Sequence, residues 1–247
     1  MREVWSIVST EGDTVAARFV SALARALTTH EERVLVLELA TLCPTLDFAF
    51  GVAERVVYTI FDVGRVSAEE TFLHPAPCGC RGVKPENIMF VPSAVGETLW
   101  EADPIRSVIA SADADITLIL ASPSYAALAR TVSDGMLLMA KTDAPLLRCA
   151  TGIASTEDFD GLVLFDFVPT REKIKKMPSL LDIADMVALP IFGILPRESG
   201  FEMSSTAGKD FRTAVGNMAE RLLGKQIPLL RGIRTEGMRK QKFFERI

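Results

Sequence analysis

The sequence is poor in the residues on which cross-linked, all-β or membrane-spanning proteins depend. Its 247 residues include only four cysteines, two tryptophans and two tyrosines. Four cysteines are too few for a disulfide scaffold, and no apolar run approaches the ~18 residues of a membrane-spanning helix. No secretory leader is recognisable, so we expect a reduced, cytoplasmic protein. The formal net charge of −5 argues against a nucleic-acid-binding surface.

Short apolar runs alternate with helical patterns along the whole chain. Strands are expected at residues 4–9, 33–39, 88–92, 116–121, 136–140, 162–165 and 191–195. Helices are expected at 14–28, 52–63, 103–111, 145–154 and 207–223, with loops at 40–51 and at 64–87, the second holding one helical turn near 68–73. The alternation predicts an α/β fold: a doubly wound, mainly parallel sheet with helices on both faces and a ligand crevice at the carboxyl ends of its strands. We expect one domain over residues 1–228 and a separate tail over 229–247.

The first strand, turn and helix occupy the place of a phosphate-binding loop. Such a loop needs several glycines, so that backbone N–H groups can reach the phosphates, and a Lys-Ser/Thr pair for the phosphates and magnesium. The turn Glu11-Gly12-Asp13 instead has one glycine and two acids. Each carboxylate replaces an attraction by a repulsion of roughly 1–4 kcal/mol. Asp13 is also a residue type that commonly caps a helix.

Five further phrases occur in a recognisable order. They are Val34-Leu-Val-Leu-Glu-Leu39, Glu54-Arg-Val-Val-Tyr58, Ile88-Met-Phe-Val-Pro-Ser-Ala94, Ala121-Ser-Pro-Ser124 and Phe192-Gly-Ile-Leu-Pro196. With them the chain resembles the MinD/ParA family of P-loop ATPases over residues 4–223, and its MinD branch most of all. The resemblance implies the P-loop NTPase fold, ATP hydrolysis, and ATP with magnesium as cofactor.

The chain departs from the family at the residues that would bind the nucleotide. Where the family's deviant Walker A loop has its signature lysine, its phosphate-binding lysine and its magnesium-binding hydroxyl, this chain has Glu11, Ala16 and Ala17. Where the family has its switch aspartates this chain has Glu38 and Ala40, and where the family has its strand-end aspartate this chain has Ala121. We therefore predict a pseudo-ATPase with no catalytic residue and no bound cofactor. The predicted degenerate nucleotide site comprises Ser9, Glu11, Gly12, Asp13, Ala16, Ala17, Glu38, Ala40 and Ala121.

One histidine and two cysteines in the loop 74–80 are the nearest approach to a metal site. A closed zinc site needs four ligands, and His74, Cys78 and Cys80 supply three. A loop with free thiols is the stronger of the two interpretations. We predict no bound metal.

The C-terminal tail is basic in an otherwise acidic chain. Residues 229–247 carry a net charge of +4, which leaves −9 on the rest. On a helical wheel three apolar side chains of the tail fall within about 100°, beside basic ones, as in a short interfacial anchor. The family resemblance adds that MinD proteins end in a similar helix that binds anionic membranes. The residues expected to contact a membrane are Met238, Lys240, Lys242, Phe243, Phe244 and Ile247; a solvated, frayed tail is an equally weighted alternative.

Two functions fit these observations. The first is a non-hydrolysing spatial organiser or scaffold in cell division or positioning, which binds a protein partner, either an active MinD/ParA relative or itself, and lies at the inner face of the cell membrane. The second is a functional MinD-type ATPase whose nucleotide contacts lie at other positions.

Overall fold

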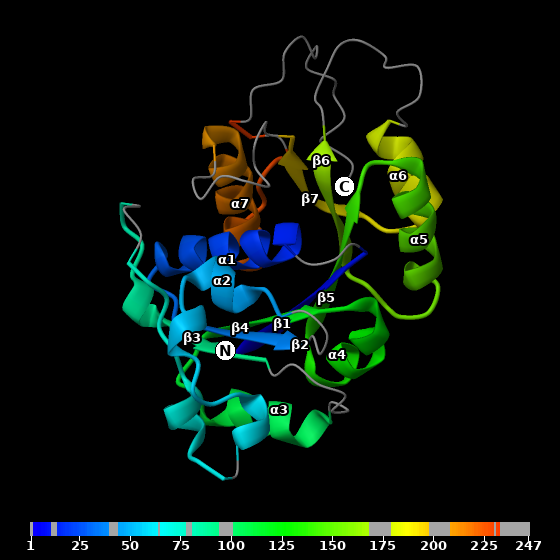
Figure 1. Ribbon diagram of the computed structural model, residues 1–247. Coiled ribbons are helices and arrows are strands. Elements are labelled where there is room, and N and C mark those ends of the chain that lie inside the picture. Colours follow the sequence, from blue (N-terminus) through cyan, green and yellow to red (C-terminus); the bar gives the residue numbers. More distant parts are fainter. Residues whose placement is uncertain are drawn as a thin grey trace. The chain divides into compact units, whose positions relative to one another are not determined.

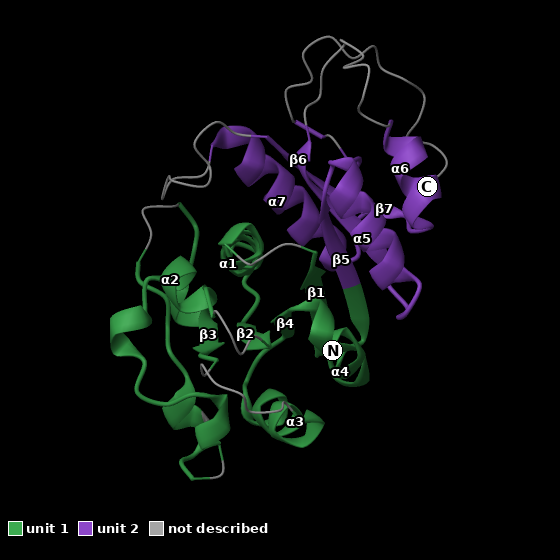
Figure 2. Cartoon of the chain, turned by 45° about the vertical axis from the view of Figure 1, so that its right-hand side comes forward, with its two compact units in different colours: residues 1–136 green, residues 137–247 purple. Residues whose placement is uncertain are grey.

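The computed structural model describes residues 2–10, 14–39, 44–63, 65–77, 81–93, 101–167, 179–197, 208–229 and 231–232 (Figure 1). The chain forms two compact units, residues 1–136 and residues 137–247, which are coloured separately in Figure 2. The predicted tail lies almost wholly outside the described residues, so the predicted boundary near residue 228 remains a prediction. No helix among the described residues is long and apolar enough to cross a membrane.

All strand pairings within each unit are parallel. Unit 1 contains β1 (Glu3–Ser9), β2 (Val34–Leu39), β3 (Ile88–Val91) and β4 (Ile116–Ala121), in the order β3-β2-β4-β1. Unit 2 contains β6 (Gly161–Phe167), β7 (Ile191–Pro196) and most of β5 (Gly135–Lys141), in the order β5-β6-β7. All seven predicted strands are confirmed, each within two residues at either end.

Helices lie on both faces of the strands in each unit. In unit 1, α1 (Thr14–Thr28) and α2 (Leu46–Phe50) lie on one face, and α3 (Ala102–Ser111) and α4 (Ala126–Val132) lie on the other (Figures 1 and 2). In unit 2, α5 (Ala144–Ala154) and α6 (Leu180–Val187) lie together, across the strands from α7 (Lys209–Leu222). The predicted doubly wound architecture is confirmed.

Burial on both faces explains why the strands are apolar along their whole length. Every residue of β2 and of β4 is buried, whereas a strand with one wet face would alternate. On α1, Phe19, Leu23 and Leu27 have no exposed surface, and burying each stabilises the fold by about 1.5–3 kcal/mol. Helix α2 contacts α1 on the same face, and the Arg25 guanidinium of α1 lies 5.8 Å from the centre of the Phe50 ring of α2.

The helix predicted over residues 52–63 is wrong. The segment contains two short 3-10 turns, Ala53–Arg55 and Ile60–Asp62, separated by residues without helical structure. The carboxylate of Asp62 accepts hydrogen bonds from the backbone N–H (2.8 Å) and hydroxyl (3.1 Å) of Thr59, and the N–H of Ile60 is bound by the carbonyl of Pro92 (3.1 Å). These bonds compete with helical ones, and the β-branched residues of the segment favour extended backbone.

Three short helices are not predicted by the sequence pattern. They are α2, which lies in the expected loop 40–51, α4 and α6. The last begins with a capping box in which the Ser179 hydroxyl accepts from the backbone N–H of Asp182 (3.2 Å), and the Asp182 carboxylate accepts from the N–H of Ser179 (2.8 Å). The capping box can be read from the local sequence. Helices of five to eight residues, however, are too short to show a clear hydrophobic period of 3.6 residues.

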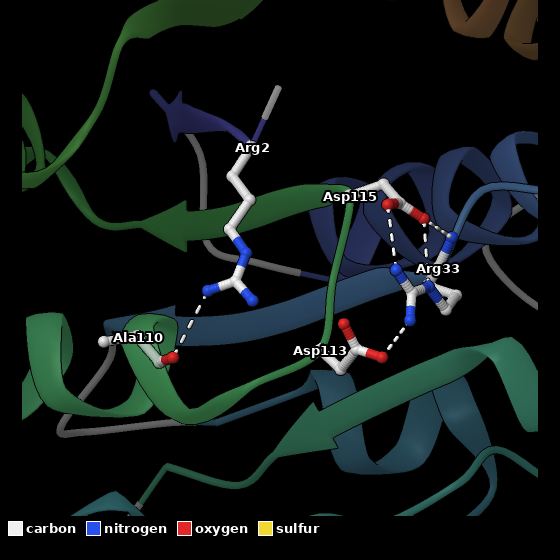
Figure 3. Close-up of polar contacts among 5 residues, drawn as sticks. All are labelled: Arg2, Arg33, Ala110, Asp113 and Asp115. Atoms are coloured by element: carbon white, nitrogen blue, oxygen red, sulfur yellow. Dashed lines mark hydrogen bonds and ion pairs between the residues drawn. The ribbon is translucent and has the colours of Figure 1, made fainter.

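An arginine fixes the beginnings of two neighbouring strands. Arg33 precedes β2, and its Nε and Nη2 donate to the two carboxylate oxygens of Asp115 (3.2 and 3.1 Å), which precedes β4 (Figure 3). The backbone N–H of Arg33 also donates to Asp115 (3.0 Å), and Arg33 Nη1 bonds to Asp113. The clamp sets the register of β2 against β4 at their amino ends.

Candidate nucleotide site

The described part of the predicted nucleotide site comes together at the carboxyl ends of β1, β2 and β4. Ala121 ends β4 and is paired with Val8 of β1 and with Leu39 of β2. Ser9, the last residue of β1, is 3% exposed, and Ala121 is 2% exposed. This is the edge where open parallel sheets bind ligands. Glu11, Gly12, Asp13 and Ala40 lie outside the described residues.

The first turn of α1 contains the two alanines that the family resemblance aligns with phosphate- and magnesium-binding residues. The helix begins at Thr14, and Ala16 and Ala17 are each 1% exposed. Neither methyl group can donate a hydrogen bond to a phosphate or coordinate magnesium. Both side chains are part of the apolar contact between α1 and the interior of unit 1.

Glu38 is buried in β2 and binds the beginning of α2. Its Oε1 accepts from the backbone N–H (2.8 Å) and the hydroxyl (3.2 Å) of Thr45, and its Oε2 accepts from the N–H of Leu46 (3.1 Å). Thr45 is the N-cap residue of α2 and makes no side-chain cap of its own. The carboxylate therefore satisfies donors that the helix leaves unpaired, and α2 is held against β2.

Burial governs the protonation of Glu38. At 2% exposure, loss of hydration raises the pKa of its carboxyl from 4.5 to about 7, because the charged form is disfavoured away from water. The hydrogen bonds from Thr45 and Leu46 act in the opposite direction, and the neighbouring charge of Asp47 adds to the rise. Desolvation is the largest of these effects, so Glu38 takes up a proton near neutral pH.

Hydroxyl groups follow the ends of β1, β3 and β4, and the predicted site residues included none of Thr10, Ser93, Ser122 and Ser124. The hydroxyls of Ser122 and Ser124, directly after β4, are hydrogen-bonded at 2.9 Å. The hydroxyl oxygen of Thr10, directly after Ser9, is buried without a hydrogen-bond partner among the described residues. Ser93, two residues beyond β3, is 7% exposed. The signal available in the sequence was the recurrence of small polar residues directly after apolar runs.

An ion-pair cluster marks the carboxyl ends of the strands of unit 2. The Asp166 carboxylate accepts from Arg197 Nη2 (2.6 Å) and Nε, and lies 3.9 Å from Lys141 Nζ. Asp166 has a left-handed backbone, φ +60°, beside an irregularity in the β6–β7 register.

The predicted metal-like loop is described only in part. His74 Nδ1 lies 2.8 Å from the carbonyl oxygen of Ile88, and Cys78 and Cys80 lie outside the described residues. Within the described ranges, no group of three His, Cys, Asp or Glu side chains could hold a metal ion.

The six residues predicted to contact a membrane lie outside the described residues, but the chain leading to them is fastened to α7. Asn217 Nδ2 donates to the carbonyl of Arg231 (2.7 Å), and Arg221 Nε donates to that of Ile227 (2.8 Å). Arg231 also pairs with Glu220 at 3.2 Å. Helix α7 ends at Leu222, and Gly224 has φ +78°, a left-handed conformation suited to glycine after a helix.

Comparison with known proteins identifies relatives over nearly the whole chain. No protein-family model matches the sequence. The septum site-determining protein MinD of Synechocystis is 23% identical over 251 residues, covering 93% of this chain and 92% of that protein. Three solved structures are similar in fold: MinD in the MinC:MinD complex of Aquifex aeolicus (TM-score 0.76, 22% identity, 92% and 98% of the two chains), MinD with Mg-ADP from Pyrococcus horikoshii (0.69, 18%, 90% and 96%), and a ParA-family ATPase from Chlorobium tepidum (0.62, 13%, 92% and 95%).

Proposed function

Because this chain has the fold of the MinD/ParA ATPases and resembles a cell-division MinD in sequence, we propose that it acts by binding, as a non-hydrolysing spatial organiser or scaffold in cell division. The observation that carries the proposal is the first turn of α1, where Ala16 and Ala17 are buried. Phosphoryl transfer depends on positive charge and metal around the transferred group. Methyl groups supply neither.

The position of Glu38 supports the same proposal. The resemblance places a switch aspartate here, yet both carboxylate oxygens of Glu38 are bound to the beginning of α2. A side chain so held would have to break these hydrogen bonds to reach a nucleotide. Its partial neutrality near pH 7 further weakens it as a ligand for magnesium.

A protein partner is part of the proposal. The Aquifex relative was solved as a MinC:MinD complex, and we infer that this chain also works through a complex, either with an active MinD/ParA relative or with a second copy of itself. The basic tail would add contact with an anionic membrane. Its affinity alone would be weak, because the apolar face is short, and dimerisation would strengthen it by joining two tails.

Thermal unfolding with and without Mg-ATP tests the proposal. A ligand at 100 times its dissociation constant stabilises a protein by about 2.7 kcal/mol, which for a chain of this length is about 5–10 °C in Tm. We expect no shift in Tm and no release of phosphate, with a MinD that has an intact loop as the positive control. A clear upward shift would overturn the proposal and support the alternative, a functional MinD-type ATPase.

A variant of the chain itself sharpens this test. Ala16→Lys and Ala17→Thr, combined with Glu11→Lys and Asp13→Gly, restore three family side chains of the loop and remove both of its acids. If the missing groups are the cause, the variant gains a Mg-ATP-dependent Tm shift that the natural chain lacks. Equal shifts in both proteins would locate the nucleotide contacts elsewhere.

A further inference from the structure

A pocket of about 380 Å³ lies at the opposite edge of unit 1 from the candidate nucleotide site. It is formed where the chain enters β1, beside the last turn of α3 and the end of α4. Its lining includes Arg2, Arg106, Ile109, Val132, Ser133 and Asp134. The pocket is open to solvent, and its volume lies near the lower end of the range of small-molecule pockets. Neither the nucleotide site nor the proposed function uses any of these residues.

Two arginines supply the charge of this amino-edge pocket. Arg2 Nη1 donates to the carbonyl of Ala110 in the last turn of α3 (3.3 Å; Figure 3), and within the described part of the chain Arg2 makes no ion pair. Arg106 Nη2 donates to the carbonyl of Thr131 in the last turn of α4 (3.0 Å). Its ion pair with Asp103 is at 3.2 Å, but the Asp103 side chain is 93% exposed, so water screens the pair.

The other polar groups of the pocket are committed to the framework. Asp134 Oδ2 accepts from the backbone N–H of Val4 (2.9 Å). The hydroxyl of Ser133 is hydrogen-bonded to that of Ser6 (2.5 Å). The lining as a whole carries two positive charges and one negative charge. Each guanidinium has five N–H donors, and the bonds of Arg2 and Arg106 to the helix carbonyls leave most of these donors available for a ligand.

The remaining wall is apolar and includes Ile109 and Val132. A ligand that satisfies both parts of the lining has an oxyanion at one end and a hydrocarbon group at the other. The net charge of +1 matches a single carboxylate better than a dianion. The guanidiniums already bind the last-turn carbonyls of α3 and α4, which reduces the repulsion that these helix ends would exert on an anion.

We propose that the amino-edge pocket binds a carboxylate attached to an apolar group, with Arg2 and Arg106 binding the carboxylate and Ile109 and Val132 contacting the apolar group. Free aliphatic carboxylates and the α-carboxylate of a protein chain ending in an apolar residue share this chemistry. The proposal does not depend on the proposed function, because it involves neither the nucleotide site nor the tail.

Titration of the full-length protein with hexanoate, followed by the amide NMR signals of residues 131–134, tests the proposal. We expect saturable shifts with hexanoate and none with 1-hexanol, which has the same chain length but no charge. Arg2→Gln and Arg106→Gln should each weaken hexanoate binding at least tenfold. Arg148→Gln, which removes an exposed arginine of α5, is the matched control and should bind as the natural chain does.

A tetrapeptide ending in valine, with a free or an amidated C-terminus, distinguishes the two sources of the carboxylate. Tighter binding of the free-acid peptide than of hexanoate assigns the pocket to a protein chain end, and binding of hexanoate alone assigns it to a small carboxylate. Arg106→Lys, which keeps the charge, should retain part of the affinity and guards against a folding defect in Arg106→Gln. Absence of saturable shifts with every carboxylate, equal binding of hexanol, or unchanged binding by both glutamine variants would overturn the proposal.

Discussion

Glu38 shows how one residue can have the right position for a site and a different task. It lies on the strand that leads to the candidate site, but its carboxylate binds the backbone at the beginning of α2. The backbone N–H groups of Thr45 and Leu46 require an acceptor at a place that water does not reach, and the carboxylate supplies it. These hydrogen bonds hold α2 against β2.

The protonation of Glu38 predicts a pH-dependent stability. Its pKa is raised to about 7 in the folded protein from 4.5, so this group's contribution to the free energy of unfolding is fully present below pH 4.5 and is lost as the pH rises to about 7. The slope is at most about 1.4 kcal/mol per pH unit. Glu38→Gln cannot titrate, and the difference in free energy of unfolding between natural chain and variant should fall by roughly 2–3 kcal/mol from pH 5 to pH 7.

Urea unfolding at pH 5, 6, 7 and 8 measures this difference. Between pH 7 and 8 the difference in free energy of unfolding between the natural chain and Glu38→Gln should change little. A difference that stays constant over the whole range would show that burial does not shift the protonation of Glu38.

Gly193 illustrates a residue whose size is fixed by its neighbour. In β7, a Cβ at this position would overlap Met218 Sδ and lie 2.7 Å from Met218 Cγ on α7. Gly193→Ala should therefore lower the free energy of unfolding by about 1–3 kcal/mol. Gly216→Ala on the same helix meets no atom within 4 Å and should raise it by up to ~1 kcal/mol, because alanine favours a helix.

Denaturant unfolding of both variants compares the two glycines directly. The cost of Gly193→Ala should shrink in a Met218→Ala background, where the overlapping side chain is gone. If the cost is the same in both backgrounds, contact with Met218 is not its cause.

At the scale of elements, long-range contacts determine the parts of unit 1 that local patterns leave open. Helix α2 depends on a carboxylate from β2. The segment 52–63 is kept from becoming helical by a bond from Ile60 to Pro92 and by the Thr59–Asp62 pair. The register of β2 and β4 is supported by the Arg33 clamp at their beginnings.

The Arg33 clamp predicts unequal roles for its two aspartates. Asp115 is 38% exposed and accepts from the guanidinium and the backbone N–H of Arg33, whereas Asp113 is 76% exposed and bonds to one nitrogen. Asp115→Ala should destabilise by about 1–2 kcal/mol after allowance for solvent screening. Asp113→Ala should cost less than ~0.5 kcal/mol. Equal losses in thermal or urea unfolding would contradict this assignment.

The same clamp predicts a pH dependence of stability opposite in sign to that of Glu38: Asp115 stabilises the fold less as the pH falls. The side-chain hydrogen bond from Arg33, followed by its backbone bond, lowers the pKa of Asp115 below its ordinary 3.8. The resulting stabilisation is present above pH 3.8 and is lost as the pH falls through the folded pKa. The natural chain and Asp115→Ala should therefore converge in stability toward the acid end of the titration.

At the scale of the whole molecule, charge is divided between an acidic body and a basic tail. The tail carries +4 and the rest of the chain −9. Ile227, just before the tail, is bound to α7 through Arg221, and Arg231, at the beginning of the tail, is bound through Asn217. Under the proposed function, these bonds would connect a membrane-bound tail directly to helix α7 and not through a free linker.

Sedimentation with liposomes tests the tail. The full chain should bind anionic vesicles, bind neutral ones at least tenfold more weakly, and release as salt is raised, because the attraction is largely electrostatic. A chain truncated before Gly237 should lose this binding, and Phe243→Ser with Phe244→Ser should weaken it while keeping the charge. Equal sedimentation of truncated and full-length protein would contradict the hypothesis that the tail is a membrane anchor.

The sequence by itself determined the strands, the helices α1, α3, α5 and α7, and the doubly wound fold. These follow from burial patterns that repeat locally: continuous apolar runs for strands covered on both faces, and a 3.6-residue period for the longer helices. It also determined which polar groups are missing from the candidate site, since Ala16 and Ala17 remain alanines in any conformation.

Only the tertiary structure decided what the remaining polar groups do. Glu38 binds α2, Asp115 binds Arg33, and Arg2 and Arg106 line one pocket, although these partners are separated by 7 to more than 80 positions in the chain. Hydrogen bonds and ion pairs act over a few ångströms in space and depend on burial. Neither the distance in space between such partners nor their burial can be read from a linear pattern, because both depend on how the strands and helices pack.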